Sequence, residues 1–360
     1  MSYERDNIRR MEGYSWGEQP DANSDVIKLN TNENPYPPSP KVDDALNKVQ
    51  GAALRTYPPP TAAPLRAAIA EHHGLSPDNV LITNGGDEAL RLAITTFVTP
   101  GLPIGMPEPS YSLYPVLADI HDSPIHRVEL DERWRPPRDF AHQLNEAGCA
   151  LSFLVNPHAP SGTLLETEAI SQLANDLNGV LLLDEAYVDF VDPALRHDAV
   201  RLINAFDNLL ILRSFSKGYG LAGLRLGYLL GQRSLIEPIV TKTRDSYNVN
   251  LLNQLLGLAA FEDQDYAGDT WERVRNDRRR LRAELQQLGL DAPASQTNFL
   301  LASVPFDATR SARELYEGLK AAGVLVRWFD TPLLEDKLRI SVGTPEQNQR
   351  LLRALADLLV

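Results

Sequence analysis

The sequence contains one cysteine, Cys149, among its 360 residues. This excludes an internal disulfide and a metal site built from several thiolates, and it fits the reducing environment of the cytoplasm. Long hydrophobic runs are also absent, because the longest, at 180–183 and 209–212, fall far short of the ~20 residues that span a bilayer. The N-terminal stretch carries charges where a signal peptide is apolar. We therefore expect a cytoplasmic protein with no membrane association and no metal site.

Positive charge is scarce relative to negative charge. Lys and Arg number 35 against 48 Asp and Glu, which gives a net charge of −13. No stretch concentrates basic residues enough to neutralise phosphates, so nucleic acid is not an expected partner. Hydrophobic residues make up 43% and charged residues 23% of the chain, which is ordinary globular composition and excludes general disorder. The length predicts two domains.

Short apolar strands alternate with helical patterns between about residues 60 and 230. This alternation predicts an α/β fold with a mainly parallel sheet covered by helices on both faces. Apolar runs predict strands at 79–83, 150–155, 179–184, 209–213 and 226–230. Helical spacing of apolar residues predicts helices at 65–72, 87–97, 111–120 and 167–177.

The pattern changes after about residue 245, where a long charged amphipathic helix at 271–288 precedes short strands and helices. Strands are predicted at 299–302, 324–328 and 338–342, and helices at 312–321 and 345–359. This order is typical of a smaller α+β domain. We expect an N-terminal arm and the start of the small domain at 1–40, a large domain at 41–245 and the small domain at 246–360.

Ligands of open parallel sheets bind outside the carboxyl ends of the strands. Glycines in the loop 84–88, before a helix, let backbone N–H groups approach a phosphate, although a plain turn with Asp87 as the helix cap explains them more simply. Asp184 ends a buried strand and needs a cation or several donors, unless it caps a helix or forms a salt bridge.

A third loop collects several polar side chains. Ser214 and Ser216 lie on one side of an extended backbone, and Arg225 can clamp a phosphate with two hydrogen bonds. A lone lysine is normally solvated, but burial near cations would lower the pKa of Lys217 and make it nucleophilic. A fourth loop, 156–162, is stiffened by prolines.

Asp184, Tyr187 and Lys217, together with a phosphate-binding loop, match the needs of pyridoxal 5'-phosphate. A carboxylate can pair with the pyridinium nitrogen, a phenol can hydrogen-bond the ring hydroxyl, and a lysine can form a Schiff base.

At these residues the chain resembles the fold-type I pyridoxal-phosphate aminotransferases, and within them the histidinol-phosphate aminotransferase family. The resemblance covers nearly the whole chain. It implies a large domain with a mainly parallel seven-stranded sheet and a smaller α+β domain. The matching segments, in chain order, are 29–35, 55–58, 84–88, 108–111, 184–187, 216–225 and 338–344.

The resemblance also implies roles for individual residues. Lys217 would bind the cofactor and shuttle a proton, with Asp184 on the ring nitrogen and Tyr187 on the ring hydroxyl. Tyr111 would stack on the ring. The cofactor phosphate would be held by Gly86, Asp87, Ser214, Ser216 and Arg225.

Substrate recognition is implied in the same way. Arg339 resembles the arginine that binds the substrate's anionic group, and Arg327 its companion. Asn34 and Tyr57 are the other expected substrate contacts. In the family, Tyr57 comes from the neighbouring subunit, where it also touches the cofactor, so a homodimer is expected.

The implied reaction is transamination of L-histidinol phosphate with 2-oxoglutarate by ping-pong kinetics. Two reactions of the same cofactor remain as alternatives, transamination of aromatic amino acids and decarboxylation of threonine phosphate.

Two positions depart from the family pattern. Ala159 stands where the family has an asparagine that hydrogen-bonds the ring hydroxyl. We therefore predict that Tyr187 holds that oxygen, alone or helped by Asn156 or a water. Tyr36 stands where a glycine is common, and we expect it to reshape the substrate pocket.

Overall fold

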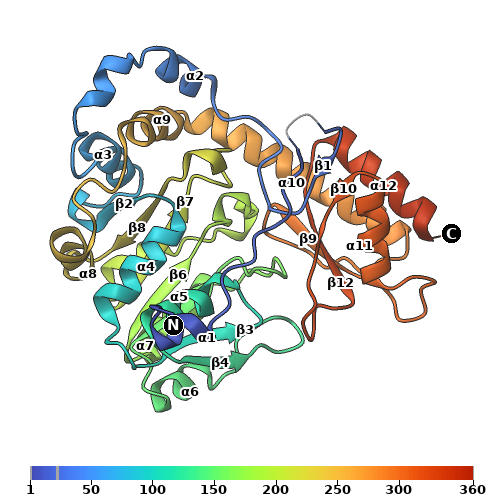
Figure 1. Ribbon diagram of the computed structural model, residues 1–360, viewed down its shortest axis with the longest axis horizontal. Helices are drawn as coiled ribbons and strands as arrows, with labels where there is room; N and C mark the ends of the chain where they lie inside the picture. The colour runs from blue at the N-terminus through green and yellow to red at the C-terminus, as the bar shows by residue number, and fades with distance from the viewer. Residues whose placement is uncertain (1, 22–23, 360) are drawn as a thin grey trace.

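The computed structural model describes residues 2–21 and 24–359 and is built around a seven-stranded sheet (Figure 1). The strand order is β2-β8-β7-β6-β5-β3-β4. β8 runs antiparallel to both neighbours and the other strands pair in parallel, which confirms the predicted α/β class and mainly parallel sheet. The strands are β2 (Val80–Thr83), β3 (Ile104–Glu108), β4 (Ile125–Glu129), β5 (Leu151–Val155), β6 (Val180–Asp184), β7 (Leu209–Ser214) and β8 (Gly227–Gly231).

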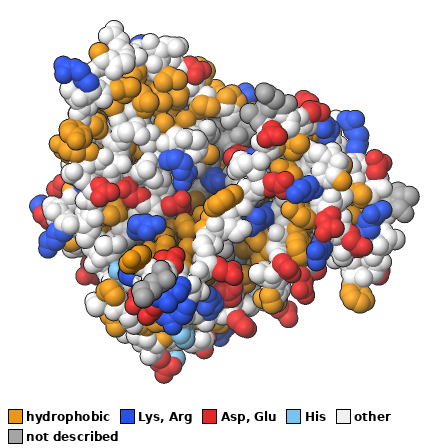
Figure 2. Space-filling model, viewed as in Figure 1, with side chains coloured by type: hydrophobic (Ala, Val, Ile, Leu, Met, Phe, Trp, Pro, Cys, Tyr) orange, Lys and Arg blue, Asp and Glu red, His pale blue; other side chains and the backbone are white. Residues whose placement is uncertain are grey.

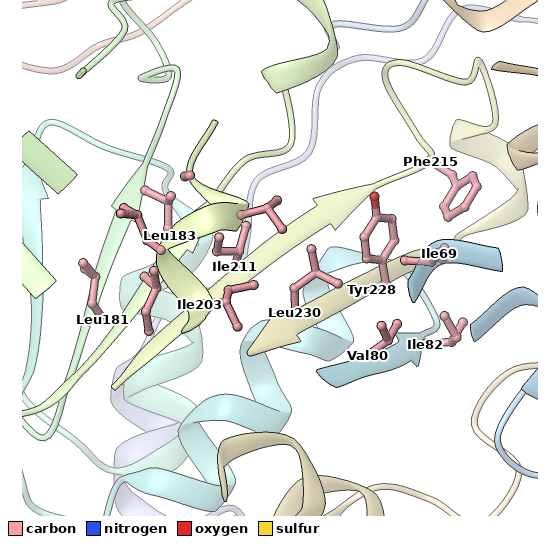
Figure 3. Close-up of a cluster of buried hydrophobic side chains, with 14 of the residues drawn as sticks. Ile69, Val80, Ile82, Leu181, Leu183, Ile203, Ile211, Phe215, Tyr228 and Leu230 are labelled. Carbon is pink, nitrogen blue, oxygen red and sulfur yellow. The ribbon is translucent and has the colours of Figure 1, made fainter. Parts of the chain in front are cut away.

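Helices cover both faces of this sheet because its central strands are apolar on both sides. Leu181 and Leu183 belong to one hydrophobic core and Leu182 to the other, as the two-residue period of a strand requires. Figure 3 shows Leu181 and Leu183 within the first core. That core is covered by α3 (Ala63–His72), α6 (Phe140–Glu146), α7 (Thr167–Asp176) and α9 (Leu251–Phe261), and the second by α4 (Gly86–Phe97), α5 (Leu113–His121) and α8 (Arg233–Pro238).

A second, antiparallel sheet lies near the C-terminus (Figure 1), with strands in the order β11-β12-β9 and a hydrophobic core of its own. The long helix α10 joins the two cores, since Ala267 packs in the large one and Leu281 in the small one. The elements are α10 (Gln264–Gln287), β9 (Phe299–Ser303), α11 (Ala312–Ala321), β11 (Arg327–Trp328), β12 (Lys337–Ser341) and α12 (Pro345–Leu359).

One predicted strand is divided in the structure. The single strand expected at 324–328 is wrong, because β10 (Val324–Leu325) pairs in parallel with β1 (Ile27–Lys28), whereas β11 pairs with β12. The chain thereby ties the N-terminal arm to the small domain. β4 was not predicted, because Val128 is its one fully buried residue and the others are polar or half-exposed, as suits an edge strand.

The remaining elements are short. The N-terminal arm begins with a helical turn beside α5, where the Arg5 guanidinium donates to the carbonyl of Ile120 at 2.7 Å. None of the helices in the described ranges is long and apolar enough to cross a membrane. The short helices are α1 (Asp6–Arg10), α2 (Pro40–Asn47), η1 (Gly51–Arg55), η2 (Pro77–Asn79), η3 (Val188–Phe190), η4 (Pro193–Leu195), η5 (Val200–Asn204), η6 (Ala222–Leu224) and the π-helical η7 (Ile239–Thr243).

Candidate active site

A cavity of about 490 Å³ lies where the carboxyl ends of the large sheet face the small one. β6 contributes Asp184, β7 contributes Ser214, and β11 and β12 contribute Arg327 and Arg339. All the predicted site residues line this cavity except Asn34 and Tyr57. Those that do are Gly86, Asp87, Tyr111, Asp184, Tyr187, Ser214, Ser216, Lys217, Arg225, Arg327 and Arg339.

Asp184 carries a buried carboxylate at the cavity floor. It accepts hydrogen bonds from the Tyr114 hydroxyl at 2.9 Å and from the backbone N–H of Ala186 at 3.1 Å. Within the described part of the chain it forms no ion pair with Lys, Arg or His. Burial therefore raises its pKa to about 6, although both hydrogen bonds oppose the rise. A cationic group bound in the cavity would stabilise this carboxylate.

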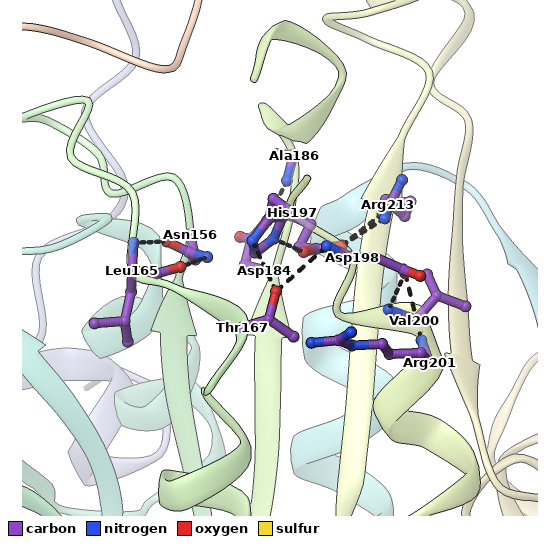
Figure 4. A network of polar contacts seen from close by, with 11 residues as sticks. Asn156, Leu165, Thr167, Asp184, Ala186, His197, Asp198, Val200, Arg201 and Arg213 are labelled. Atoms are coloured by element: carbon purple, nitrogen blue, oxygen red, sulfur yellow. Dashed lines mark hydrogen bonds and ion pairs between the residues drawn. The ribbon is translucent and has the colours of Figure 1, made fainter. Parts of the chain in front are cut away.

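The next residue, Glu185, is in the opposite situation. Its side chain is fully buried between His197, at 2.9 Å, and Arg213, at 2.7 Å (Figure 4 shows both partners). The charge of Arg213 and the hydrogen bond with His197 hold its pKa below the ordinary value despite the burial. Successive residues of a strand face opposite sides, so Arg213 and His197 bond Glu185, whereas Asp184 faces the cavity.

Lys217 follows β7 and reaches into the same cavity. Its amine donates to the backbone carbonyl of Thr31 at 2.9 Å. Burial, with the nearby charges of Arg339 and Arg225, lowers its pKa to about 8, whereas Glu33 opposes the change. A lysine in this setting is partly neutral near neutral pH and can act as a nucleophile or a base.

The end of the cavity at the start of α4 is suited to an anion. The first N–H groups of the helix lie there without intrahelical partners. Gly85 precedes them as the N-cap, with a φ of 84° that lets the chain turn from β2 into α4. A Cβ at Gly85 would lie 3.0 Å from the Arg225 guanidinium. That guanidinium donates to Ser216 Oγ at 3.3 Å and to Asp87 at 3.2 Å, so it is fixed at this end.

Three tyrosines cluster at α5, of which Tyr14 and Tyr111 line the cavity and Tyr114 is buried behind them; only Tyr111 was predicted from the sequence. Tyr111 meets Tyr114 edge-on at 5.4 Å and Tyr14 at 6.1 Å. Tyr114 was missed because its fully buried position on an apolar helix face reads as core, yet its hydroxyl reaches Asp184. Tyr14 comes from the N-terminal arm and lines the cavity.

Tyr187 lies beside Phe299, ring centroid to centroid 5.1 Å, and its hydroxyl accepts a hydrogen bond from the Asn32 amide at 3.1 Å. Asn32 was not among the predicted site residues. Asn156 does not line the cavity, and its amide bonds the backbone N–H and carbonyl of Leu165, so its assistance to Tyr187 stays a prediction.

Arg327 and Arg339 lie directly opposite each other on the antiparallel strands β11 and β12. Both guanidinium groups lie over the ring of Phe329, at 5.3 and 5.4 Å from its centroid. Burial and the charge of Arg327 lower the pKa of Arg339. Like charges in this register destabilise a sheet, so an anion bound between them would relieve the repulsion.

Three expected contacts lie elsewhere. The Asn34 amide donates to the carbonyls of Lys217 and Gly218, both at 3.1 Å, so it braces the lysine loop and does not line the cavity. The expectation that Tyr36 reshapes the pocket is wrong, because its hydroxyl bonds Asp277 of α10 at 2.6 Å, outside the cavity lining. Tyr57 is 79% exposed and stacks on Tyr247 at 4.4 Å.

Several buried polar atoms of the cavity have no partner within the described chain. Buried side-chain atoms without a hydrogen bond include Asn30 Oδ1, Thr31 Oγ1, Ser110 Oγ and Arg339 Nε, and all four residues line this cavity. Such groups are rarely left unsatisfied in native proteins. Together with the unpaired carboxylate of Asp184, they indicate that a polar ligand completes the site.

The fold and this cavity together define a fold-type I pyridoxal-phosphate enzyme. A family model described as aminotransferase class I and II matches residues 24–355. Histidinol-phosphate aminotransferase 1 of Trichormus variabilis is 40% identical over 358 residues, which is 99% of both chains. The histidinol-phosphate aminotransferase of Citrifermentans bemidjiense is 39% identical over 354 residues, 98% of each chain.

Solved structures agree with this assignment. The crystal structure of histidinol-phosphate aminotransferase from Sinorhizobium meliloti in complex with pyridoxal-5'-phosphate superposes with a TM-score of 0.91 at 25% identity, covering 100% of this chain and 98% of that one. The chain therefore belongs to the class I and II aminotransferases and, within them, to the histidinol-phosphate aminotransferase family.

The residues of the cavity fit pyridoxal phosphate. A pyridinium nitrogen would supply the cation that Asp184 lacks. A phosphate matches the free N–H groups of α4 and the fixed guanidinium of Arg225. Lys217, with its lowered pKa, lines the same space.

Proposed function

We propose that the protein catalyses the pyridoxal-phosphate-dependent transamination of L-histidinol phosphate with 2-oxoglutarate, giving imidazole acetol phosphate and glutamate, a step of histidine biosynthesis. The observation that carries this proposal is one cavity lined by Lys217, by Asp184 and by the opposed pair Arg327 and Arg339. The names of the relatives near 40% identity support the choice of substrate.

The cofactor would be held from several sides. Asp184 would pair with its ring nitrogen, Tyr187 with its ring hydroxyl, and Tyr111 would lie against the ring. The phosphate would be held by the N–H groups of Gly86 and Asp87, the hydroxyls of Ser214 and Ser216, and Arg225. When bound, pyridoxal phosphate supplies an electron sink for the negative charge that develops at the substrate's α-carbon.

Lys217 would bind the cofactor and move the proton. A pKa of about 8 leaves part of the amine neutral near neutral pH. Its nitrogen can therefore accept a proton from the substrate's α-carbon and donate it to the cofactor's C4′ carbon. Asn34 would keep the lysine loop in place through its two hydrogen bonds to the loop carbonyls. Asn34 would therefore act as a positioning residue and not as a substrate contact.

The arginine pair would bind the anionic end of each substrate. Guanidinium groups bind phosphates and carboxylates with two parallel hydrogen bonds. Histidinol phosphate offers a phosphate, and glutamate offers a carboxylate. Because both would use the same arginines in turn, the first product must leave before the second substrate binds, which gives ping-pong kinetics.

We also propose a homodimer in which Tyr57 completes the neighbouring cavity and touches both cofactor and substrate there. Tyr57 is exposed and lies outside its own chain's cavity lining. Leu46 and Leu54 are exposed nearby, at 47% and 56%, and Figure 2 shows hydrophobic side chains gathered around the α2–α3 region. Exposed apolar groups of this kind are typical of protein interfaces.

Two further expectations from the sequence stay predictions. The first is the division of the chain into domains at about residues 40 and 245. The second is the cytoplasmic location, which is expected from the single cysteine.

Product analysis tests the proposed reaction. Purified enzyme supplied with pyridoxal phosphate is incubated with 2-oxoglutarate and one amino donor, either histidinol phosphate, phenylalanine or threonine phosphate. Glutamate should form fastest with histidinol phosphate, in equal amount to imidazole acetol phosphate. Preference for phenylalanine, or carbon dioxide release from threonine phosphate without glutamate, would overturn the substrate assignment.

A further inference from the structure

Ala159 leaves a gap in the hydrogen bonding of the proposed cofactor site, and the following inference rests on the proposed function. Its methyl group is buried in a small apolar cluster with Val155 and Phe299, against the ring of Tyr187. It offers no amide to a ring oxygen. Asn156, the nearest asparagine along the loop, bonds the backbone of Leu165 through both ends of its amide and does not line the cavity.

Asn32 brings an amide to the same place from a different part of the chain. Its side chain is 2% exposed, lines the cavity and donates from Nδ2 to the Tyr187 hydroxyl at 3.1 Å. Its other polar groups are all engaged. Ser341 Oγ donates to Asn32 Oδ1 at 3.0 Å and accepts from the Asn32 backbone N–H at 2.9 Å, and the Asn298 amide donates to the Asn32 carbonyl at 2.9 Å.

The direction of the hydrogen bond to Tyr187 matters. Since the Tyr187 oxygen accepts from Asn32, its own O–H proton is free to point elsewhere, and a phenol has one such proton to donate. The fixed amide thus makes Tyr187 a donor toward the cavity.

The backbone of Asn32 is also unusual. Its φ is 56°, in the left-handed region that few residues other than glycine adopt. Asparagine tolerates this region better than most residues, but glycine meets it with no steric cost. The backbone alone therefore does not explain the asparagine, whereas the bonds of its amide to Tyr187 and Ser341 do.

We propose that Asn32 is a positioning residue that fixes the Tyr187 hydroxyl as a donor to the cofactor's ring oxygen, and that it thereby compensates for the absence of an asparagine at position 159. Asn32 acts through Tyr187, and Ser341 in turn holds the amide of Asn32.

Equilibrium binding to the apoprotein tests this proposal without relying on activity. The ligands are pyridoxal phosphate and its analogue without the ring hydroxyl. Asn32→Gly removes the amide but suits the left-handed backbone. It should weaken pyridoxal phosphate about tenfold and leave the analogue within about twofold of wild type. The absorbance titration of bound pyridoxal phosphate should also move to higher pH, because the ring oxygen loses a donor.

Two further variants sharpen the result. Ala159→Asn, added to Asn32→Gly, should restore the affinity for pyridoxal phosphate, and Ser341→Ala should give a smaller loss in the same direction. Asn30→Ala is the matched control, because this buried amide lines the same cavity but donates to the carbonyl of Glu18 at 2.9 Å. It should change the affinities for both ligands alike.

An equal loss of both ligands in Asn32→Gly, or no loss at all, would overturn the role of Asn32. Failure of the wild-type apoprotein to bind pyridoxal phosphate would instead contradict the proposed function.

Discussion

Asp184 and Glu185 are adjacent in sequence and both buried, yet Glu185 lies between Arg213 and His197, whereas Asp184 has no ionic partner among the described residues. The strand geometry explains the difference, since the two side chains face opposite sides of the sheet. The carboxylate of Glu185, on the core side, has ionic and hydrogen-bond partners from the protein. The carboxylate of Asp184, on the cavity side, has hydrogen bonds but no ionic partner among the described residues. An unpaired carboxylate costs stability until a cationic ligand arrives.

The first prediction concerns the stability of the unliganded protein. Because the folded pKa of Asp184, about 6, is raised above its ordinary 3.8, its ionisation opposes folding, and stability is lost as the pH rises from about 4 through about 6. Asp184→Asn should therefore raise the free energy of unfolding of the apoprotein by about 1–3 kcal/mol near pH 7, and by almost nothing near pH 4. Urea denaturation at both pH values measures this.

Two controls accompany that measurement. The pKa of Asp189 is also raised to about 6, so the stability of each protein alone depends on pH through Asp189 as well. The difference in unfolding free energy between wild type and Asp184→Asn isolates the contribution of Asp184. Glu185→Gln should do the opposite and destabilise by about 3–5 kcal/mol, since it leaves Arg213 and His197 without their partner. An Asp184→Asn protein that is less stable at pH 7 would show that the carboxylate has a structural cation.

The second prediction concerns Tyr114. Tyr114→Phe removes a hydrogen bond to the Asp184 carboxylate, which should raise the pKa of Asp184 further and weaken cofactor binding about fivefold to thirtyfold. Fluorescence titration of the apoprotein with pyridoxal phosphate gives the affinity. Tyr228→Phe is the matched control, because this buried hydroxyl faces His73 at 3.3 Å in the other core. Equal affinities in both variants would argue against a contribution from Tyr114.

The third prediction separates the two arginines. Arg339→Lys should raise KM about tenfold to a hundredfold for both histidinol phosphate and glutamate, since each substrate loses a bidentate pair of hydrogen bonds. Arg327→Gln should raise KM for histidinol phosphate more than for glutamate, because a phosphate carries the greater charge. Steady-state kinetics with each substrate varied in turn measure this. A change in kcat without a change in KM would place these arginines outside substrate binding.

The fourth prediction tests the shared site. Lys217→Ala and Tyr57→Ala chains are each expected to be nearly inactive. When the two chains are unfolded and refolded together, about half of the dimers contain one chain of each kind. Each mixed dimer has one intact site, so roughly a quarter of the wild-type activity should return. Light scattering gives the oligomeric state. No recovery in a confirmed mixed dimer would mean that Tyr57 serves its own chain.

Much of the fold could be predicted from the sequence because the signals are local. β6 is a continuous apolar run that is buried on both faces, and α11 begins at Ala312 after the N-cap Ser311, which forms a capping box with Glu314. The strand expected at 324–328 failed because pairing partners are not visible in the sequence, and its two halves pair with strands that are far apart along the chain.

The site was predicted less evenly. Asp184, at the end of β6, and Lys217, in the loop after β7, were found because their chemistry is exceptional at such positions. Tyr114 and Asn32 were missed because each acts through a partner distant in sequence, Asp184 in one case and Tyr187 in the other. A buried tyrosine on an apolar helix face is normally core packing, and nothing local distinguishes the two.

One measurement tests the central claim most directly, namely single-turnover absorbance of the enzyme loaded with pyridoxal phosphate. Histidinol phosphate alone should convert the cofactor's band to that of its amino form, and 2-oxoglutarate added afterwards should restore the band. Lys217→Ala should prevent the rapid conversion. A band that histidinol phosphate leaves unchanged, in wild-type enzyme that holds the cofactor, would contradict the account.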